Sequence, residues 1–256
     1  LRVVYSALDS LRLAKLYPQK KIVFLAVGFE TTAPTIALSI ISARQENLRN
    51  LFFLSSLKLI PPAMACLAQD KRLNLHAFLC PGHVSAIIGM RPYEFIAKRY
   101  KIACCIAGFE PLDILEGIYL LLKQIVDKKP EVMNQYTRAV KKCGNTKSLA
   151  AMDKVFRVVD TSWRGIGRIP ESGLKIRNEF SAFDAQKFFS LDDKEQIISG
   201  QQRKCRCGDI LKGLISPGAC PLFSKICHPD NPIGPCMISS EGACNAHYKY
   251  RKGVDV

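Results

Sequence analysis

The chain has 256 residues, of which 48% are hydrophobic, and it carries a formal net charge of +15. This length and apolar content fit one large or two smaller folded domains and exclude wholesale disorder. No run of 18 or more apolar residues is present, so we expect no membrane-spanning helix. The basic residues are scattered rather than gathered into a recognisable nucleic-acid-binding motif, so we do not expect nucleic acid as a partner.

Residues 1–128 alternate short apolar runs with helix-like segments, which predicts an α/β fold with parallel strands. We expect strands at residues 21–27, 51–55, 75–79 and 102–107. We expect helices at residues 35–45, 61–68 and 111–126, of which the last is the clearest amphipathic helix. After residue 128 this alternation of strands and helices ends. A further helix is expected at 147–159, and residues 163–167 are expected to form a loop.

Two similar segments lie 80 residues apart, and both lead from an apolar strand through Gly-Phe-Glu into a helix. Gly28 begins the first copy of this tripeptide and Gly108 begins the second. The repeat predicts two related parallel-sheet α/β units, which we place at residues 1–100 and 101–203. In such sheets functional groups gather beyond the carboxyl ends of the strands. Glu30, Thr32 and His83 are therefore the candidate catalytic residues.

The last part of the chain, residues 204–256, is rich in Cys, Gly and Pro. It holds six of the eleven cysteines: Cys205, Cys207, Cys220, Cys227, Cys236 and Cys244. No secretion signal is present, so a disulfide framework is disfavoured and metal or redox chemistry is favoured. The six thiols lack the paired short spacings of zinc knuckles, and this favours an iron–sulfur cluster over zinc. Spacing alone does not choose four ligands among the six.

Several motifs together resemble one family. They are Gly28-Phe29-Glu30-Thr31-Thr32-Ala33-Pro34, Pro81-Gly82-His83-Val84-Ser85, Ala107-Gly108-Phe109-Glu110-Pro111-Leu112-Asp113, Trp163-Arg164-Gly165-Ile166-Gly167, Cys220-Pro221-Leu222-Phe223, and the segment from Gly234 to Cys244. In this order they resemble the HypD family of hydrogenase maturation proteins, and the likeness runs through essentially the whole chain.

This resemblance implies a part in building the iron centre of [NiFe] hydrogenases, in the cytoplasm. It implies a transient iron that acquires cyanide and carbon monoxide ligands. The implied partners are a HypC-like small chaperone and a HypE-like cyanide donor. It also implies a [4Fe-4S] cluster held by Cys207, Cys220, Cys227 and Cys244, which leaves Cys205 and Cys236 as weaker candidates. The cluster is expected to pass electrons to a thiol pair.

The chain departs from the family pattern at its beginning. It starts at Leu1 and lacks the Cys-Gly-x-His-Thr-His and Cys-Pro-x-Cys motifs expected near the family's N-terminus. We therefore expect a fragment from which the iron-binding cysteine and the redox pair are missing. Two alternatives remain open. One is a ferredoxin-type disulfide reductase that uses Cys205 and Cys236, and the other is a structural zinc module that binds a protein.

The candidate residues at strand ends also have plainer interpretations. His83 is a candidate proton donor or metal neighbour, because imidazole serves in both roles, and it could instead cap the helix that follows. Glu30 and Thr32 could orient an iron-bound ligand, or they could cap a helix N-terminus. Glu110 and Asp113 share this ambiguity.

Overall fold

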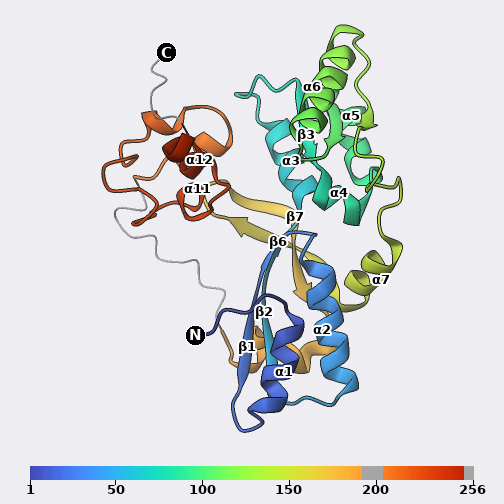
Figure 1. The fold of residues 1–256 in the computed structure, drawn as a ribbon, viewed down its shortest axis with the longest axis vertical. Coiled ribbons are helices and arrows are strands. Elements are labelled where there is room, and N and C mark those ends of the chain that lie inside the picture. The colour runs from blue at the N-terminus through green and yellow to red at the C-terminus, as the bar shows by residue number, and fades with distance from the viewer. Residues whose placement is uncertain (192–203, 251–256) are drawn as a thin grey trace. The chain divides into compact units, whose positions relative to one another are not determined.

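The computed structural model describes residues 1–191 and 204–250 (Figure 1). The chain separates into two compact units. Unit 1 comprises Leu1–Gln69, Leu75–Thr161 and Pro170–Asp192, and unit 2 comprises Asp70–Asn74, Ser162–Ile169 and Asp193–Val256. None of the helices in the described ranges is long and apolar enough to cross a membrane.

Sheet A has the strand order β1-β2-β7-β6. Its strands are β1(Ile22–Gly28), β2(Leu51–Lys58), β6(Phe156–Trp163) and β7(Gly167–Ile176). β1 and β2 run parallel along their whole length, whereas β7 pairs with β2 antiparallel, with Leu57 opposite Leu174. Sheet A is therefore mixed rather than purely parallel. The strand–helix alternation did not predict this, because β6 and β7 come from the segment after residue 128.

Sheet B has the strand order β3-β4-β5, and its pairings are parallel. Its strands are β3(Ala77–Pro81), β4(Ala103–Ala107) and β5(Val132–Asn134). All five residues of β4 are buried, as expected for the central strand of a covered parallel sheet. The mixed α/β fold with parallel strands is thus confirmed. The four strands and three helices expected in residues 1–128 occur in the predicted order, and the helices at 8–16, 82–88, 91–93 and 94–100 were not predicted.

The helices of unit 1 connect and cover these strands (Figure 1). They are α1(Leu8–Leu16), α2(Ala33–Gln45), α3(Ile60–Gln69), α4(Gly82–Ile88), η1(Arg91–Tyr93), α5(Glu94–Tyr100), α6(Pro111–Val126), α7(Thr146–Val155), η2(Asn178–Phe183) and α8(Ala185–Phe188). Proline lies in the first turn of α2 and of α6, where its missing N–H costs no hydrogen bond. The helix expected at 147–159 ends at Val155, because β6 begins at Phe156 and continues through two valines that favour strand.

α6 lies on sheet B with an unusual face inward. Gly117 allows the close approach, since a Cβ there would lie 2.8 Å from Leu79 Cδ1 and 2.9 Å from Ala107 Cβ. Gln124 donates a hydrogen bond to the backbone oxygen of Cys104 at 3.3 Å. The buried residues of α6 are Asp113, Gly117, Leu121 and Gln124, so a largely polar and small face packs on the sheet. An amphipathic helix ordinarily does the reverse.

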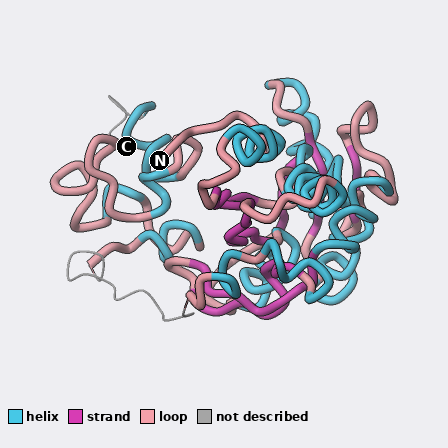
Figure 2. The backbone as a smooth tube through the Cα atoms, turned by 90° about the horizontal axis from the view of Figure 1, so that it is seen from below, coloured by secondary structure: helices cyan, strands magenta, loops and turns pink. Residues whose placement is uncertain are grey.

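Unit 2 consists mostly of loops that join short helices (Figure 2). Its described helices are α10(Cys207–Leu211), η3(Pro217–Ala219), α11(Pro235–Ile238) and α12(Ala243–Tyr250). Its core is a cluster in which Cys207, Cys220, Cys227, Cys236 and Cys244 pack with Ile210, Leu222 and Met237. Thiols thus make up most of a core that has few other apolar side chains. The predicted limits of three domains, at residues 100 and 203, stay predictions.

Candidate metal centre and strand-end turns

The six cysteines of unit 2 converge from separate loops and helices. Five of them are buried, Cys205 is half-buried, and all six are free thiols. Side-chain hydrogen bonds link Cys205 to Cys207, Cys207 to Cys236, and Cys236 to Cys244. Cys220 and Cys227 lie near enough to act electrostatically on Cys244. The six thiols therefore lie in one region of unit 2, and their role as metal ligands stays a prediction.

The pKa values of the linked thiols follow their hydrogen bonds. The bond from Cys236 lowers the pKa of Cys244. The pKa of Cys207 rises to about 11, because the bond with Cys236 and burial outweigh the lowering effect of the bond with Cys205. A thiolate is favoured where neighbouring donors point at it. Among the four linked thiols, Cys244 is thus the one whose surroundings favour the thiolate form.

Glycines leave space around the sulfur atoms. A Cβ on Gly234 would lie 2.5 Å from Cys205 Sγ, and a Cβ on Gly165 would lie 2.9 Å from Cys207 Sγ. Gly165 also has a φ of +88°, which other residues rarely adopt. The Trp163 to Gly167 loop is therefore a close neighbour of the thiols within unit 2. The close packing explains why glycines occur in this loop, and they need no chemical role.

The six thiols of unit 2 are chemically suited to bind an iron–sulfur cluster. Clusters are bound by four soft thiolates and are tuned by N–H groups that point at sulfur. The backbone N–H of Ile233 donates to Cys227 Sγ at 3.4 Å, which is a contact of that kind. Within residues 1–191 and 204–250, however, no three His, Cys, Asp or Glu side chains are arranged around a common metal position. The four linked thiols include two of the favoured cluster ligands, Cys207 and Cys244. The other two linked thiols are the weaker candidates, Cys205 and Cys236.

His83 lies exposed at the start of α4, directly after β3. Its ring packs against Phe109 with centroids 4.9 Å apart and the two ring planes tilted by 41°. Phe109 belongs to the second Gly-Phe-Glu turn, at the end of the neighbouring strand β4. The two motifs, which the sequence places at strand ends, thus lie side by side at one edge of sheet B. His83 does not cap α4 with its side chain, since that helix has no side-chain cap.

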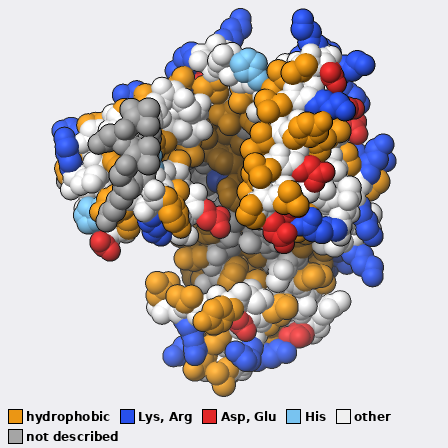
Figure 3. All heavy atoms as spheres, turned by 45° about the horizontal axis from the view of Figure 1, so that its top comes forward, with side chains coloured by type: hydrophobic (Ala, Val, Ile, Leu, Met, Phe, Trp, Pro, Cys, Tyr) orange, Lys and Arg blue, Asp and Glu red, His pale blue; other side chains and the backbone are white. Residues whose placement is uncertain are grey.

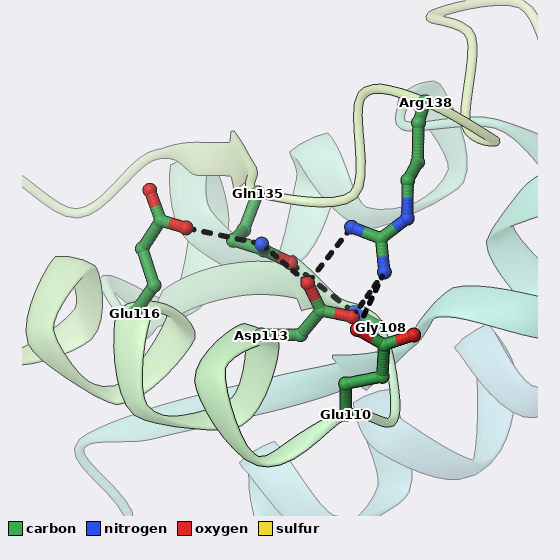
Figure 4. Close-up of polar contacts among 6 residues, drawn as sticks. All are labelled: Gly108, Glu110, Asp113, Glu116, Gln135 and Arg138. Carbon is green, nitrogen blue, oxygen red and sulfur yellow. Dashed lines mark hydrogen bonds and ion pairs between the residues drawn. The ribbon is translucent and has the colours of Figure 1, made fainter.

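Asp113 anchors the second Gly-Phe-Glu turn (Figure 4). Its carboxylate is buried and accepts two hydrogen bonds from Arg138, at 2.8 Å and 2.5 Å. Gln135 donates to the same carboxylate at 2.8 Å and accepts from the N–H of Gly108 at 3.2 Å. The bond from Arg138 lowers the pKa of Asp113 to about 2. These contacts make Asp113 a structural anchor for the turn on which His83 stacks.

Sequence reasoning missed Arg138 and Gln135. They lie in an irregular segment after β5, with no motif around them. Their pairing with Asp113 spans more than 20 residues, so no local pattern indicates it. Both residues lie among other polar residues, so the sequence did not mark either of them as functional.

Glu30 lies at the first Gly-Phe-Glu turn but points inward and is only 1% exposed. Its Oε1 accepts a hydrogen bond at 2.8 Å from the backbone N–H of Ile60, the first residue of α3. Its Oε2 has no hydrogen-bond partner among the described residues. Glu30 also lines a largely apolar cavity of about 480 Å³. Burial raises the pKa of Glu30 to about 7, because desolvation penalises the charged form.

Thr32 is exposed, and its hydroxyl donates to the backbone oxygen of Phe29 at 3.1 Å. It thereby closes the turn that follows Gly28, whose φ is +140°. In residues 1–191 and 204–250, Glu30, Thr32 and His83 make no hydrogen bond to one another. The three candidates thus lie at strand-end turns as predicted, without forming one hydrogen-bonded group.

Comparison with known proteins identifies the family. The family model HypD, described as the hydrogenase formation hypA family, matches residues 1–251. The chain is 40% identical over 263 residues to the hydrogenase maturation factor HypD of Cupriavidus necator, covering 100% of this chain and 69% of that protein. It is 42% identical over 255 residues to the hydrogenase expression/formation protein HupD of Azotobacter chroococcum, covering 97% of this chain and 66% of that protein.

A third relative is the hydrogenase maturation factor HypD of Rhodobacter capsulatus, which is 41% identical over 252 residues. The match covers 98% of this chain and 67% of that protein. The chain thus spans about two thirds of the length of these relatives. The resemblance seen in the sequence motifs is confirmed: this chain belongs to the HypD family of hydrogenase maturation factors.

Proposed function

We propose that this chain acts in assembly of the Fe(CN)2CO centre of [NiFe] hydrogenases, as a scaffold and electron relay. In this role it would work with a HypC-like small chaperone and a HypE-like cyanide donor, and the iron that carries cyanide and carbon monoxide would be its cargo. Membership of the HypD family supports the general maturation role. The observation that carries the relay is the convergence of six free thiols in unit 2.

Cys207, Cys220, Cys227 and Cys244 are the proposed ligands of a [4Fe-4S] cluster. When bound, such a cluster supplies one-electron transfer. The protein's part is to bury the thiols, to direct the N–H of Ile233 at Cys227, and to leave glycine-sized space around the sulfurs. Burial and N–H contacts of this kind determine the reduction potentials of iron–sulfur clusters in proteins.

The turns of sheet B would present His83 to the cargo. His83 is exposed and is held by stacking on Phe109, whose turn is fixed by Asp113 and its partners. Glu30 has a different part in this proposal. It fixes the start of α3 and lines the apolar cavity. Its carboxyl group, whose Oε2 is buried without a hydrogen-bond partner among the described residues, holds a proton up to about pH 7.

Anaerobic purification with iron and sulfide analysis tests the proposal. We expect about four irons and four sulfides per chain, and a brown absorbance that bleaches on reduction. The chain is then joined to the N-terminal motifs expected of the family and assayed for rescue of hydrogenase activity in a strain that lacks its own HypD, because those motifs are absent from residues 1–256. Stoichiometric zinc without sulfide or colour would instead identify a structural zinc module. A loaded cluster that reduces disulfides through Cys205 and Cys236, without rescuing hydrogenase activity, would identify a reductase.

A further inference from the structure

Basic side chains are in excess along this chain, and the excess is greatest in unit 2. Figure 3 shows Lys and Arg side chains spread over the visible face, as expected of a chain that has 37 Lys and Arg against 22 Asp and Glu. The described parts of unit 2, residues 70–74, 162–169 and 204–250, carry nine Lys and Arg against four Asp and Glu. Unit 2 also holds the six converging thiols. Its surface charge therefore acts on any molecule that approaches those thiols.

Cys205 is the most accessible of the six thiols, since it is half-buried and the other five are buried. Its two neighbours in the chain, Lys204 and Arg206, are exposed cations. Arg164 is exposed as well and lies near enough to act electrostatically on Cys205. Its Nη2 donates a hydrogen bond to the backbone oxygen of Ile233 at 2.8 Å, which holds the guanidinium beside the thiols. Three cations thus lie around the point where the thiols come closest to solvent.

Two carboxylates hold further cations of this surface in place. Asp209 accepts a hydrogen bond from Arg206, three residues earlier at the start of α10. Asp70 pairs with Arg72 at 2.6 Å and with Lys212 at 3.3 Å. The carboxylate side chains are the less exposed partners of the two arginines, at 32% against 50% for Asp209 and Arg206, and at 14% against 62% for Asp70 and Arg72. The guanidinium groups therefore dominate the charge that solvent meets.

We call this surface the basic rim. It comprises five cations and two carboxylates, which are Arg72, Arg164, Lys204, Arg206 and Lys212 with Asp70 and Asp209. Arg72 and Asp209 act on each other electrostatically, so the pairs are neighbours. An excess of one sign of charge raises the local concentration of oppositely charged partners and speeds their encounter. The cations come from three separate segments of the chain, and this spread fits a broad acidic surface better than one small anion.

We propose that the basic rim is the docking surface for a small acidic electron-carrier protein. This inference rests on the proposed function, because an electron relay needs a source of electrons. Electron transfer weakens steeply with distance, so a carrier should dock where the group of thiols comes closest to the surface, beside Cys205. One electron leaves the reduced iron–sulfur centre of the carrier and enters unit 2, and no bond is made or broken. Weak encounters steered by charge are usual for electron-transfer pairs.

Isothermal titration calorimetry of the anaerobically purified chain with an acidic [2Fe-2S] ferredoxin tests the proposal. We expect binding whose Kd rises at least about tenfold between roughly 20 mM and roughly 200 mM salt, because salt screens surface charges. Arg72→Glu and Arg206→Glu should each raise the Kd at least about tenfold at low salt. Arg12→Glu is the matched control. Arg12 is exposed on α1 in unit 1 and pairs with Asp9 three residues away, as Arg206 pairs with Asp209.

Reduction kinetics separate docking from loss of the cluster. Each variant is first analysed for iron and sulfide. Loaded rim variants should be reduced at least about tenfold more slowly than the native chain by reduced ferredoxin. Reduced methyl viologen is a cation that the rim does not attract, so it should reduce the rim variants at least as fast as the native chain.

A loaded chain that binds no ferredoxin overturns this inference and leaves the proposed function standing. So does binding that Arg12→Glu weakens as much as the rim variants do, since net charge alone would then explain it. A chain without iron and sulfide overturns the proposed function, and this inference with it. Binding of a DNA duplex or of anionic phospholipid vesicles through the rim, without ferredoxin binding, also overturns the inference and assigns the rim to that partner.

Discussion

The guanidinium of Arg138 binds both carboxylate oxygens of Asp113, and so ties a loop after β5 to the first turn of α6. Asp113 is buried, whereas Arg138 is half exposed. A Cβ on Gly108 would collide with this carboxylate, so the turn before α6 also depends on the position of Asp113. One ion pair therefore fixes the strand end, the helix start and the ring on which His83 stacks.

Asp113→Asn should make the protein less sensitive to acid and less stable at neutral pH. The pKa of Asp113 is lowered to about 2 in the folded state by its bond with Arg138, so the unfolded chain binds its proton first as pH falls. Its stabilising contribution is complete above about pH 4 and is lost on acidification towards about pH 2. Urea unfolding at several pH values measures this. Asp127→Asn, at the exposed far end of α6, is the control, and an equal acid slope in both variants would refute the role of the pair.

Glu30→Gln should gain stability relative to the native chain as pH rises. The pKa of Glu30 is raised to about 7 in the folded state, so the folded chain keeps a proton that the unfolded chain releases from about pH 4.5 upward. Stability therefore falls between about pH 4.5 and about pH 7, by an amount on the order of 3 kcal/mol. Gln cannot ionise, so urea unfolding should show a flatter pH profile in this window. Glu131→Gln, an exposed glutamate, should leave the native profile in place.

Gly117→Ala should destabilise unit 1 by about 1–2 kcal/mol, although alanine favours helix over glycine. The added Cβ would lie 2.8 Å from Leu79 Cδ1 and 2.9 Å from Ala107 Cβ, so α6 would have to move away from sheet B. Urea denaturation gives the change. Gly218→Ala is the control, because a Cβ at Gly218 meets no atom within 4 Å. A gain in stability for Gly117→Ala would show that α6 sits farther from the sheet.

Replacing single cysteines by serine should divide the six thiols of unit 2 into two groups. We expect Cys207, Cys220, Cys227 and Cys244 to be needed for iron and sulfide binding, because they are the proposed ligands. Cys205→Ser and Cys236→Ser should retain the cluster. The exposed Cys143 provides the control substitution. The hydrogen-bonded chain through Cys205 and Cys236 gives the competing assignment, which loss of iron in those two variants would establish.

In the chain joined to the N-terminal motifs expected of the family, His83→Ala should reduce rescue of hydrogenase activity without changing stability. His83 is exposed and makes no hydrogen bond in the described parts of the chain, so its removal leaves the fold intact. The expected loss of activity is about tenfold or more, in line with removal of a positioned proton donor. His83→Phe keeps the stacking on Phe109 and serves as the comparison. Full activity in His83→Phe would show that stacking, and not the imidazole, is what the turn needs.

Local patterns predicted the elements well where apolar periodicity was strong. The helix from Pro111 to Val126 was placed at its observed bounds, and the strands of residues 1–128 were found within a few residues. β6 and β7 were missed, because β7 pairs with β2 across more than 100 residues and β6 joins the sheet only beside β7. The direction of the apolar face of α6 was equally hidden. Periodicity shows that a helix has two faces, but contacts made by Gly117 and Gln124 decide which face the sheet receives.

The sequence predicted which residues belong to the candidate sites better than it predicted how those residues are arranged. Cysteine spacing predicted a metal site held by four of the six thiols. The six pack into one unit, but which of them bind a metal stays a prediction, because contacts between particular thiols depend on loop conformations that spacing does not determine. The sequence also placed Glu30 and His83 at strand ends, where both lie. It could not show that one points into the protein and the other into solvent.

The two Gly-Phe-Glu turns place their glutamates in opposite dielectric surroundings. In both copies the tripeptide leads from a strand towards a helix, yet Glu30 is 1% exposed and the Glu110 side chain is 79% exposed. Sequence identity between repeated segments therefore does not determine the solvation of the charge. An isotope-edited infrared carboxyl band would report a dry environment for the first glutamate and a hydrated one for the second, although a repeat search treats them as equivalent.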